Sequence, residues 1–168
     1  MVERTSFEDW NCSAARALEV VGDWWTMMIV RECMYGTRRF SDFQRRLGIS
    51  KNILTRRLQK MEDDDLLARI QSSSDRRTSD YRLTAKGKSL FTILIALMQW
   101  GDQWEQDGEP PMQFVDRLTG QPLERLVVRD VEGNPVKPSR LIPVPGPGAD
   151  EDTIERFFYD GRHEGGVT

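Results

Sequence analysis

The stretch RFSDFQRRLGISKNILTRRLQKM, residues 39–61, decides the fold of this chain. Its first part, from Ser41 to Leu47, has the spacing of a short helix, and Gly48 can adopt the left-handed conformation that ends one. Ser50 then offers a side-chain oxygen that can cap a second helix over residues 50–62. Two helices joined by a short turn with a glycine predict a helix-turn-helix motif.

The second helix of this motif has two chemically different faces. Leu54, Leu58 and Met61 recur at positions i, i+4 and i+7, so they share one apolar face that can pack against a core. Asn52 and Arg56 lie among the polar residues of the opposite face. The motif therefore has one face for packing and one face free to contact a partner.

Working outward, the apolar spacing predicts a helix over residues 11–21 and a buried helix over 24–34 that begins after Asp23. Downstream, two short apolar runs within residues 67–83 flank a polar turn and predict a hairpin, which directly after a helix-turn-helix is a wing. Thr84 can cap a long helix that runs to about residue 107. These elements predict a winged helix-turn-helix.

The sequence changes character at Glu109-Pro110-Pro111, which breaks the last long helix. Beyond this point we expect strands at residues 114–118, 123–130 and 141–144, a helix over 152–159 and a loose tail. The predicted fold class is mainly α with a small β wing, plus a C-terminal β-rich appendage. The predicted domains are residues 1–108, for DNA binding and dimerisation, and residues 109–168, an extension of unknown role.

Charge is unevenly distributed along the 168 residues. The formal net charge is −3, yet the segment from Arg31 to Lys88 carries 15 basic and 8 acidic residues, an excess of +7. Because this excess coincides with the helix-turn-helix and the wing, it predicts a polyanionic partner, double-stranded DNA.

Enzyme and metal chemistry find no support in the sequence. It has no glycine-rich phosphate loop and no serine, histidine and aspartate in a catalytic order, and its one histidine, His163, is far from Cys12 and Cys33. The acidic run at residues 63–65 points in several directions on a helix, which favours a solvated helix end over a metal site. We expect no catalytic residue, no cofactor and no metal.

The first thirty residues contain several charged side chains and no long apolar run. The sequence therefore predicts neither a signal peptide nor a membrane helix, no membrane partner, and a cytoplasmic protein.

The candidate DNA contacts fall into two chemical classes. Amides can pair with adenine, arginine with guanine, and a threonine hydroxyl with a base edge or a phosphate; the base-reading candidates are Asn52, Thr55, Arg56 and Gln59. Basic and hydroxyl side chains around them can bind backbone oxygens, which position a protein without reading sequence. The backbone candidates are Arg38, Arg39, Ser50, Lys51, Arg57, Lys60, Arg76, Arg77 and Arg82.

Over residues 12–104 the chain resembles the HxlR-type branch of the MarR-like winged-helix transcription regulators. The matching stretches are Cys12, 17–22, Trp25-Thr26, 29–32, 38–44, 48–58 and 81–87. The resemblance implies a DNA-binding regulator whose recognition helix lies in the major groove. If the protein is a homodimer, its twofold symmetry requires a pseudo-palindromic operator. Two departures stand out: Cys12-Ser13 replaces the usual Cys-Pro, and Gly22-Asp23-Trp24-Trp25 replaces Gly-Gly-Lys-Trp. The second puts in doubt a phosphate contact by the missing lysine.

The helix predicted after Thr84 carries more apolar residues than one domain core can bury, which indicates a dimer interface. The predicted interface residues are Leu18, Phe91, Leu94, Ile95, Met98, Trp100 and Trp104. The four tryptophans at positions 24, 25, 100 and 104 could instead line a pocket for a small-molecule effector. Core or interface packing is the commoner role of such residues.

Cys12 precedes a helix, where the helix dipole stabilises a thiolate, so it is a candidate redox or electrophile sensor; its alternative role is a small packing residue. In the family the matching cysteine serves some members as a sensor. Cys33 lies within an apolar helix and is predicted to be in the core.

An alternative function for the whole chain is that of a winged-helix protein that contacts only proteins, in which the basic face has no role in binding.

Overall fold

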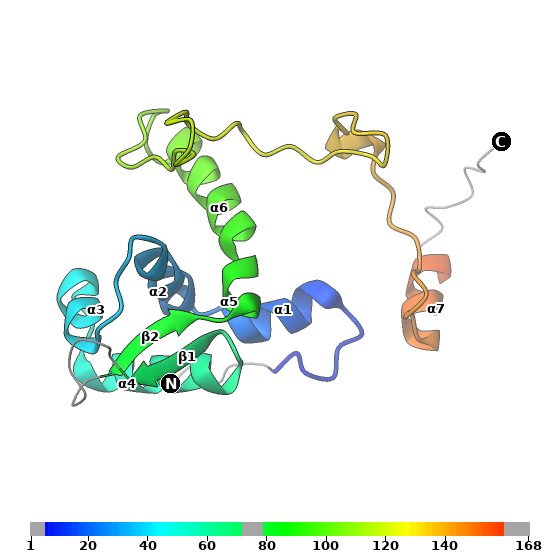
Figure 1. Ribbon diagram of the computed structural model, residues 1–168. Coiled ribbons are helices and arrows are strands. Elements are labelled where there is room, and N and C mark those ends of the chain that lie inside the picture. Colours follow the sequence, from blue (N-terminus) through cyan, green and yellow to red (C-terminus); the bar gives the residue numbers. More distant parts are fainter. Residues whose placement is uncertain (1–5, 72–78, 160–168) are drawn as a thin grey trace. The chain divides into compact units, whose positions relative to one another are not determined.

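The computed structural model describes residues 6–71 and 79–159, and Figure 1 shows the arrangement of the elements along the chain. The elements are α1 (Ser13–Val21), α2 (Trp24–Met34), α3 (Phe40–Leu47), α4 (Lys51–Asp63), β1 (Leu67–Gln71), β2 (Ser79–Leu83), α5 (Ala85–Ser89), α6 (Phe91–Trp104), the short 3-10 helix η1 (Pro138–Arg140) and α7 (Glu151–Tyr159). The chain forms two compact units, residues 20–126 and residues 1–19 with 127–168. No helix among the described residues is long and apolar enough to cross a membrane.

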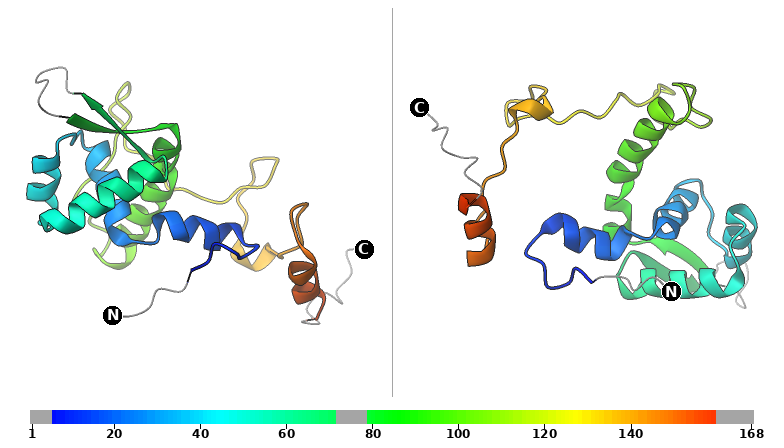
Figure 2. Two further views of the ribbon diagram at one scale, coloured as in Figure 1. Left: turned by 90° about the horizontal axis from the view of Figure 1, so that it is seen from below. Right: turned by 180° about the vertical axis from the view of Figure 1, so that it is seen from behind.

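The core of the larger unit is centred on α2. Ile29 and Val30 on this helix are fully buried, and they join Phe43 of α3 and Leu54 of α4 in one apolar cluster. Helix α2 contacts α3, α4, α6 and β2. Figure 2 shows the fold of the chain from two further sides. The predicted buried helix after Asp23 is therefore confirmed.

Local capping chemistry explains where the helices of the larger unit begin and end. The carboxylate of Asp23 accepts a hydrogen bond from the Trp25 amide, and the Ser50 hydroxyl accepts one from the Ile53 amide. Gly48 ends α3 with a left-handed backbone, φ 63°. These contacts confirm the predicted helix-turn-helix within one residue at each end.

The wing is an antiparallel hairpin in which Leu67 pairs with Leu83 and Gln71 with Ser79. Its second strand is tied to the motif, because the Tyr81 amide donates a hydrogen bond to the Arg38 carbonyl at 2.8 Å. The wing predicted over residues 67–83 is confirmed on both strands. Its tip, residues 72–78, lies outside the described residues, and so do the candidates Arg76 and Arg77.

The single long helix predicted after Thr84 is wrong, because the chain breaks at Leu90 into α5 and α6. The Leu90 amide bonds to the carbonyl of Gly87, three residues back, so the last turn of α5 is tight. Gly87 itself lies against the chain before β1: a side chain there would place its Cβ 2.1 Å from the Leu66 carbonyl oxygen. Thr84 does cap α5, as predicted.

The β-rich character predicted for the C-terminal extension is also wrong in detail. Instead of strands at residues 114–118, 123–130 and 141–144, the described part of the extension has two isolated bridges, Val115 to Pro122 and Arg129 to Pro135. Each bridge includes a proline, which lacks the amide proton that a strand ladder needs, and a lone hairpin is marginal in water. The helix predicted at 152–159 is confirmed as α7.

Residues 109–126 group with the larger unit, whereas the sequence predicts a domain boundary after residue 108. Compact units are defined by contacts between residues, whereas a domain is defined by its ability to fold independently. The predicted domain boundary after residue 108 therefore stays a prediction. Helix α1 begins in the smaller unit, and its last two residues, Val20 and Val21, pack against the core of the larger one.

Candidate nucleic-acid interface

Helix α4 presents a polar surface built on a buried apolar stripe. Leu54, Leu58 and Met61 are at most 1% exposed, which fixes the rotation of the helix about its axis. The opposite side is then turned outward by the helical period. Its exposed residues are Lys51, Asn52, Thr55, Arg56, Gln59 and Lys60.

The four base-reading candidates lie together on this exposed side of α4. The Thr55 hydroxyl donates to the Lys51 carbonyl at 2.9 Å, and the Gln59 amide donates to the Asp63 carboxylate at 3.0 Å. Within the described residues the side chains of Asn52 and Arg56 form no hydrogen bond, so both can bind a base without first breaking one.

The backbone candidates differ in their exposure and in the contacts that they make. Arg39, Ser50, Lys51 and Arg82 are exposed. Arg38 is engaged within the protein: its guanidinium donates to the carbonyls of Cys33 and Thr37, at 2.7 and 2.8 Å. These two contacts hold the turn between α2 and α3, and a phosphate contact by Arg38 would compete with them. Lys60 is exposed and pairs with Asp64 at 2.7 Å.

Arg57 forms an ion pair that the sequence analysis missed. Its guanidinium binds the Asp23 carboxylate, which also caps α2, and both side chains are mostly buried. The pair links α4 to the start of α2. The only sequence signal for it is the departure at Asp23 from the Gly-Gly-Lys-Trp pattern.

A second missed contact is a buried carboxylate beneath the motif. Glu32 is 3% exposed and accepts a hydrogen bond from the Thr37 hydroxyl at 3.1 Å. It also pairs with Arg31 at 2.9 Å and with Arg46 of α3 at 4.0 Å. Because Glu32 has these partners, its charge can be buried and can fix α3 relative to α2.

Comparison with known proteins places this motif in a family. The sequence profile of the HxlR-like helix-turn-helix family matches residues 20–109. The chain belongs to the HxlR-like helix-turn-helix family. It is 37% identical over 137 residues to the uncharacterized HTH-type transcriptional regulator Rv3095 of Mycobacterium tuberculosis, covering 81% of this chain and 87% of that protein. Proteins of this family are transcriptional regulators, not enzymes.

Two solved structures extend the comparison. The crystal structure of the protein PA1607 aligns with a TM-score of 0.78 and 37% identity, over 84% of this chain and all of that one. The redox regulator HypR in its oxidized form aligns with a TM-score of 0.50 and 26% identity, over 55% of this chain and 96% of that one. The winged-helix fold of this HxlR-like protein is thereby shown, and its role is that of a transcriptional regulator.

In this HxlR-like chain, α6 has one buried and one exposed apolar side. Leu94 and Ile95 pack inside the chain's own core, and Phe91 and Met98 are half-buried. The exposed side is a continuous stripe with helical spacing, at least half exposed at each position: Ile93, Leu97, Trp100 and Trp104. The predicted interface residues Leu94 and Ile95 are thus turned inward. Ile93 and Leu97, which the sequence analysis missed, could have been found by counting back from Trp104 and Trp100 in helical steps.

The tryptophans at positions 24, 25, 100 and 104 do not form one pocket. Trp25 packs against the core, whereas Trp24, Trp100 and Trp104 are exposed. Hollows do occur beside α6, but other residues line them. The acidic run at residues 63–65 ends α4, and within the described residues no cluster of three metal-binding side chains occurs.

The two cysteines of this HxlR-like chain have opposite environments. Cys12 is exposed just before α1, and the Arg16 amide donates to its carbonyl at 3.0 Å. A hollow of about 390 Å³ adjoins it, within the smaller unit, between residues 11–16 and 144–149. Cys33 is 2% exposed, and this burial raises the pKa of its thiol to about 12. The prediction that Cys33 belongs to the core is confirmed.

Proposed function

We propose that this protein is a homodimeric, sequence-specific DNA-binding regulator whose helix α4 enters the major groove while the wing contacts the backbone. One observation carries the proposal: Asn52 and Arg56 stand outward and unengaged on a helix whose other face is fully buried. A helix fits the major groove of B-DNA, where arginine can pair with guanine and asparagine with adenine. The local charge excess of +7 supplies the attraction to phosphate.

The wing and the flanks of α4 supply the sequence-independent part of binding. Lys51, Arg39 and Arg82 are exposed cations close in sequence to the motif or on the wing. Contacts of this kind hold a protein in register on DNA and release counterions, so they make binding depend on salt.

The decisive experiment is a gel shift on the DNA flanking the protein's own gene, repeated over a range of salt concentrations. We expect binding that weakens with salt. Asn52→Ala or Arg56→Ala should cost about 1–3 kcal/mol and relax the preference at particular base pairs. Arg82→Ala is the matched control and should weaken binding to all sequences alike.

The outcomes separate the alternatives. A complete lack of binding at low salt would favour the other role, a winged helix that contacts only proteins. If Asn52→Ala and Arg82→Ala lose specificity to the same degree, the division into base and backbone contacts is wrong.

Dimerisation follows from the exposed stripe on α6. A row of four large apolar side chains in water is an aggregation hazard for a monomer, and a second copy of the same helix can cover it. Two recognition helices related by a twofold axis then bind a pseudo-palindromic operator, with half-sites about 34–36 Å apart or a multiple of this distance.

We also propose that electrophiles or oxidants switch the protein through Cys12. Its exposure and its place before α1 support this, as does the likeness to HypR, whose structure is that of a redox regulator in its oxidized form. Cys33 is protected by burial. Diamide and a quinone should release DNA from the wild type and not from Cys12→Ser; equal responses would remove the switch and leave DNA binding untouched.

A further inference from the structure

The segment after α6 folds back against the larger unit through a few specific contacts. The Phe114 ring lies between the rings of Tyr35 and Phe91, with both centroid distances 5.7 Å. Farther along, the Gln99 side chain of α6 donates to the Glu124 carbonyl at 3.0 Å and accepts from the Leu126 amide at 2.8 Å. The segment is therefore fastened to the unit at two places.

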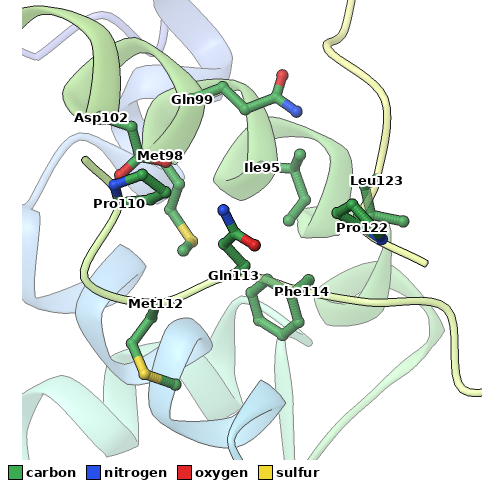
Figure 3. Close-up of a pocket in the computed structure, with 10 residues that line it drawn as sticks. All are labelled: Ile95, Met98, Gln99, Asp102, Pro110, Met112, Gln113, Phe114, Pro122 and Leu123. Carbon is green, nitrogen blue, oxygen red and sulfur yellow. The ribbon is translucent and has the colours of Figure 1, made fainter. Parts of the chain in front are cut away.

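Between these two fastenings lies a hollow of about 160 Å³. Figure 3 shows its apolar walls, with Ile95 and Met98 on α6 facing Phe114 and Leu123 on the returning segment. An apolar cavity of about 150 Å³ is large enough for a benzene ring. The hollow thus has the size and lining for one aromatic ring.

Two polar side chains at this hollow have no assigned partner. Asp102 and Gln113 both line it, and within the described residues neither side chain makes a hydrogen bond or ion pair. Asp102 is partly buried on the last turns of α6, close to the end where the helix dipole is negative. A donor group on a bound ring would satisfy this carboxylate.

The surrounding charge selects a cation. Residues 89–116 contain five carboxylates and no lysine or arginine. Among the residues that line this hollow and the adjoining one, the one basic side chain is Arg31, which is already paired with Glu32. An anionic ligand would therefore meet repulsion without compensation, whereas an ammonium group would be attracted.

We infer that the hollow between α6 and residues 110–123 binds a small aromatic ammonium ion, with its ring among Met98, Phe114 and Leu123 and its ammonium on Asp102. Such a ligand would bridge the helix and the segment that covers it. Neither Cys12 nor any of the exposed tryptophans is among the residues that line it, and it does not depend on DNA binding.

Benzylamine is the probe. Titration into the full chain, followed by the backbone amide NMR spectrum, should give saturable shifts centred on Gln113 and Phe114, with a dissociation constant on the order of 1 mM. Asp102→Asn keeps the shape of the side chain and removes its charge, so it should weaken binding about tenfold. Asp107→Asn is the matched control, because it removes one charge from the same acidic segment outside the hollow, and it should change binding less than about twofold.

Two further ligands separate the contribution of the aromatic ring to binding from that of the positive charge. Benzyl alcohol has the ring without the cation, and methylammonium has the cation without the ring; both should bind at least about tenfold more weakly than benzylamine. Equal affinity for benzyl alcohol, or an unchanged affinity in Asp102→Asn, would overturn the assignment of the ammonium to Asp102. The absence of saturable shifts at about 10 mM benzylamine would overturn the site itself.

Discussion

Asp23 makes two contacts with one carboxylate, and these have different consequences. One oxygen caps α2 through the Trp25 amide, and the other binds the Arg57 guanidinium of α4. The Nε of Arg57 is buried and has no hydrogen-bond partner, so loss of Asp23 would leave a mostly buried cation unpaired. The pair therefore contributes to the position of α4.

Asp23→Asn should isolate the ion pair from the cap, because asparagine caps helices as well as aspartate does. We expect the free energy of unfolding to fall by about 1–3 kcal/mol in Asp23→Asn and in Arg57→Ala. Urea denaturation of both variants and of the double variant measures the coupling. Additive losses would show that the two side chains do not interact.

The same variants test whether Arg57 contacts phosphate. If Asp23 holds it, Arg57→Ala should leave the salt dependence of DNA binding nearly unchanged, whereas Lys51→Ala should reduce the slope by about 0.9. An equal reduction of the slope in Arg57→Ala would show that Arg57 contacts phosphate.

The Ser50 and Asp23 caps could be predicted because capping is local in sequence, but the Arg57 partner could not, because it lies 34 residues away.

At the scale of elements, the close packing of α5 against the chain before β1 depends on Gly87. A methyl group at this position would meet the Leu66 carbonyl oxygen, which also accepts a hydrogen bond from the Thr84 amide at 3.1 Å. Backbone cannot move aside as a flexible side chain can. Gly87→Ala should therefore lower the free energy of unfolding by at least about 2 kcal/mol.

Gly101→Ala on α6 is the matched control for this prediction. A Cβ at Gly101 would meet nothing within 4 Å, and the residue is helical, so alanine should stabilise the protein by about 0.5–1 kcal/mol. Thermal or urea unfolding of the two variants should show shifts of opposite sign. A neutral Gly87→Ala would mean that α5 is not packed as closely as the structure has it.

Elements with strong local signals could be predicted, and those that depend on distant contacts could not. The wing strands have apolar side chains that the core buries, Leu67 and Tyr81, so their pattern was informative. In the extension, Leu118, Val128 and Val131 are exposed, so an apolar run there does not indicate a buried strand. Likewise, the close approach of Gly87 to Leu66, three residues before the break at Leu90, joins positions that are remote in sequence.

At the scale of the whole molecule, the proposed dimer depends on the exposed stripe on α6. Ile93, Leu97, Trp100 and Trp104 are spaced by four, three and four residues, which keeps them on one side of the helix. In the proposed dimer they would pack against the same stripe of a second copy, in a twofold interface in which α6 of one copy lies against α6 of the other. The excess of apolar residues could be predicted from sequence; which side is outward depends on how Leu94 and Ile95 are buried.

Leu97→Glu should convert the dimer to a monomer, because a carboxylate at the centre of the interface would be buried without a partner. Leu118→Glu is the matched control: Leu118 is 94% exposed in the extension, and the same change there should leave the mass by light scattering at that of the dimer.

Since two half-sites are read together only by a dimer, Leu97→Glu should also lose most of its preference for the palindrome over a single half-site while keeping a salt-dependent affinity for DNA. A wild-type protein that scatters as a monomer at micromolar concentration would contradict the interface, and an unchanged palindrome preference in monomeric Leu97→Glu would show that dimerisation does not set the spacing of the recognition helices.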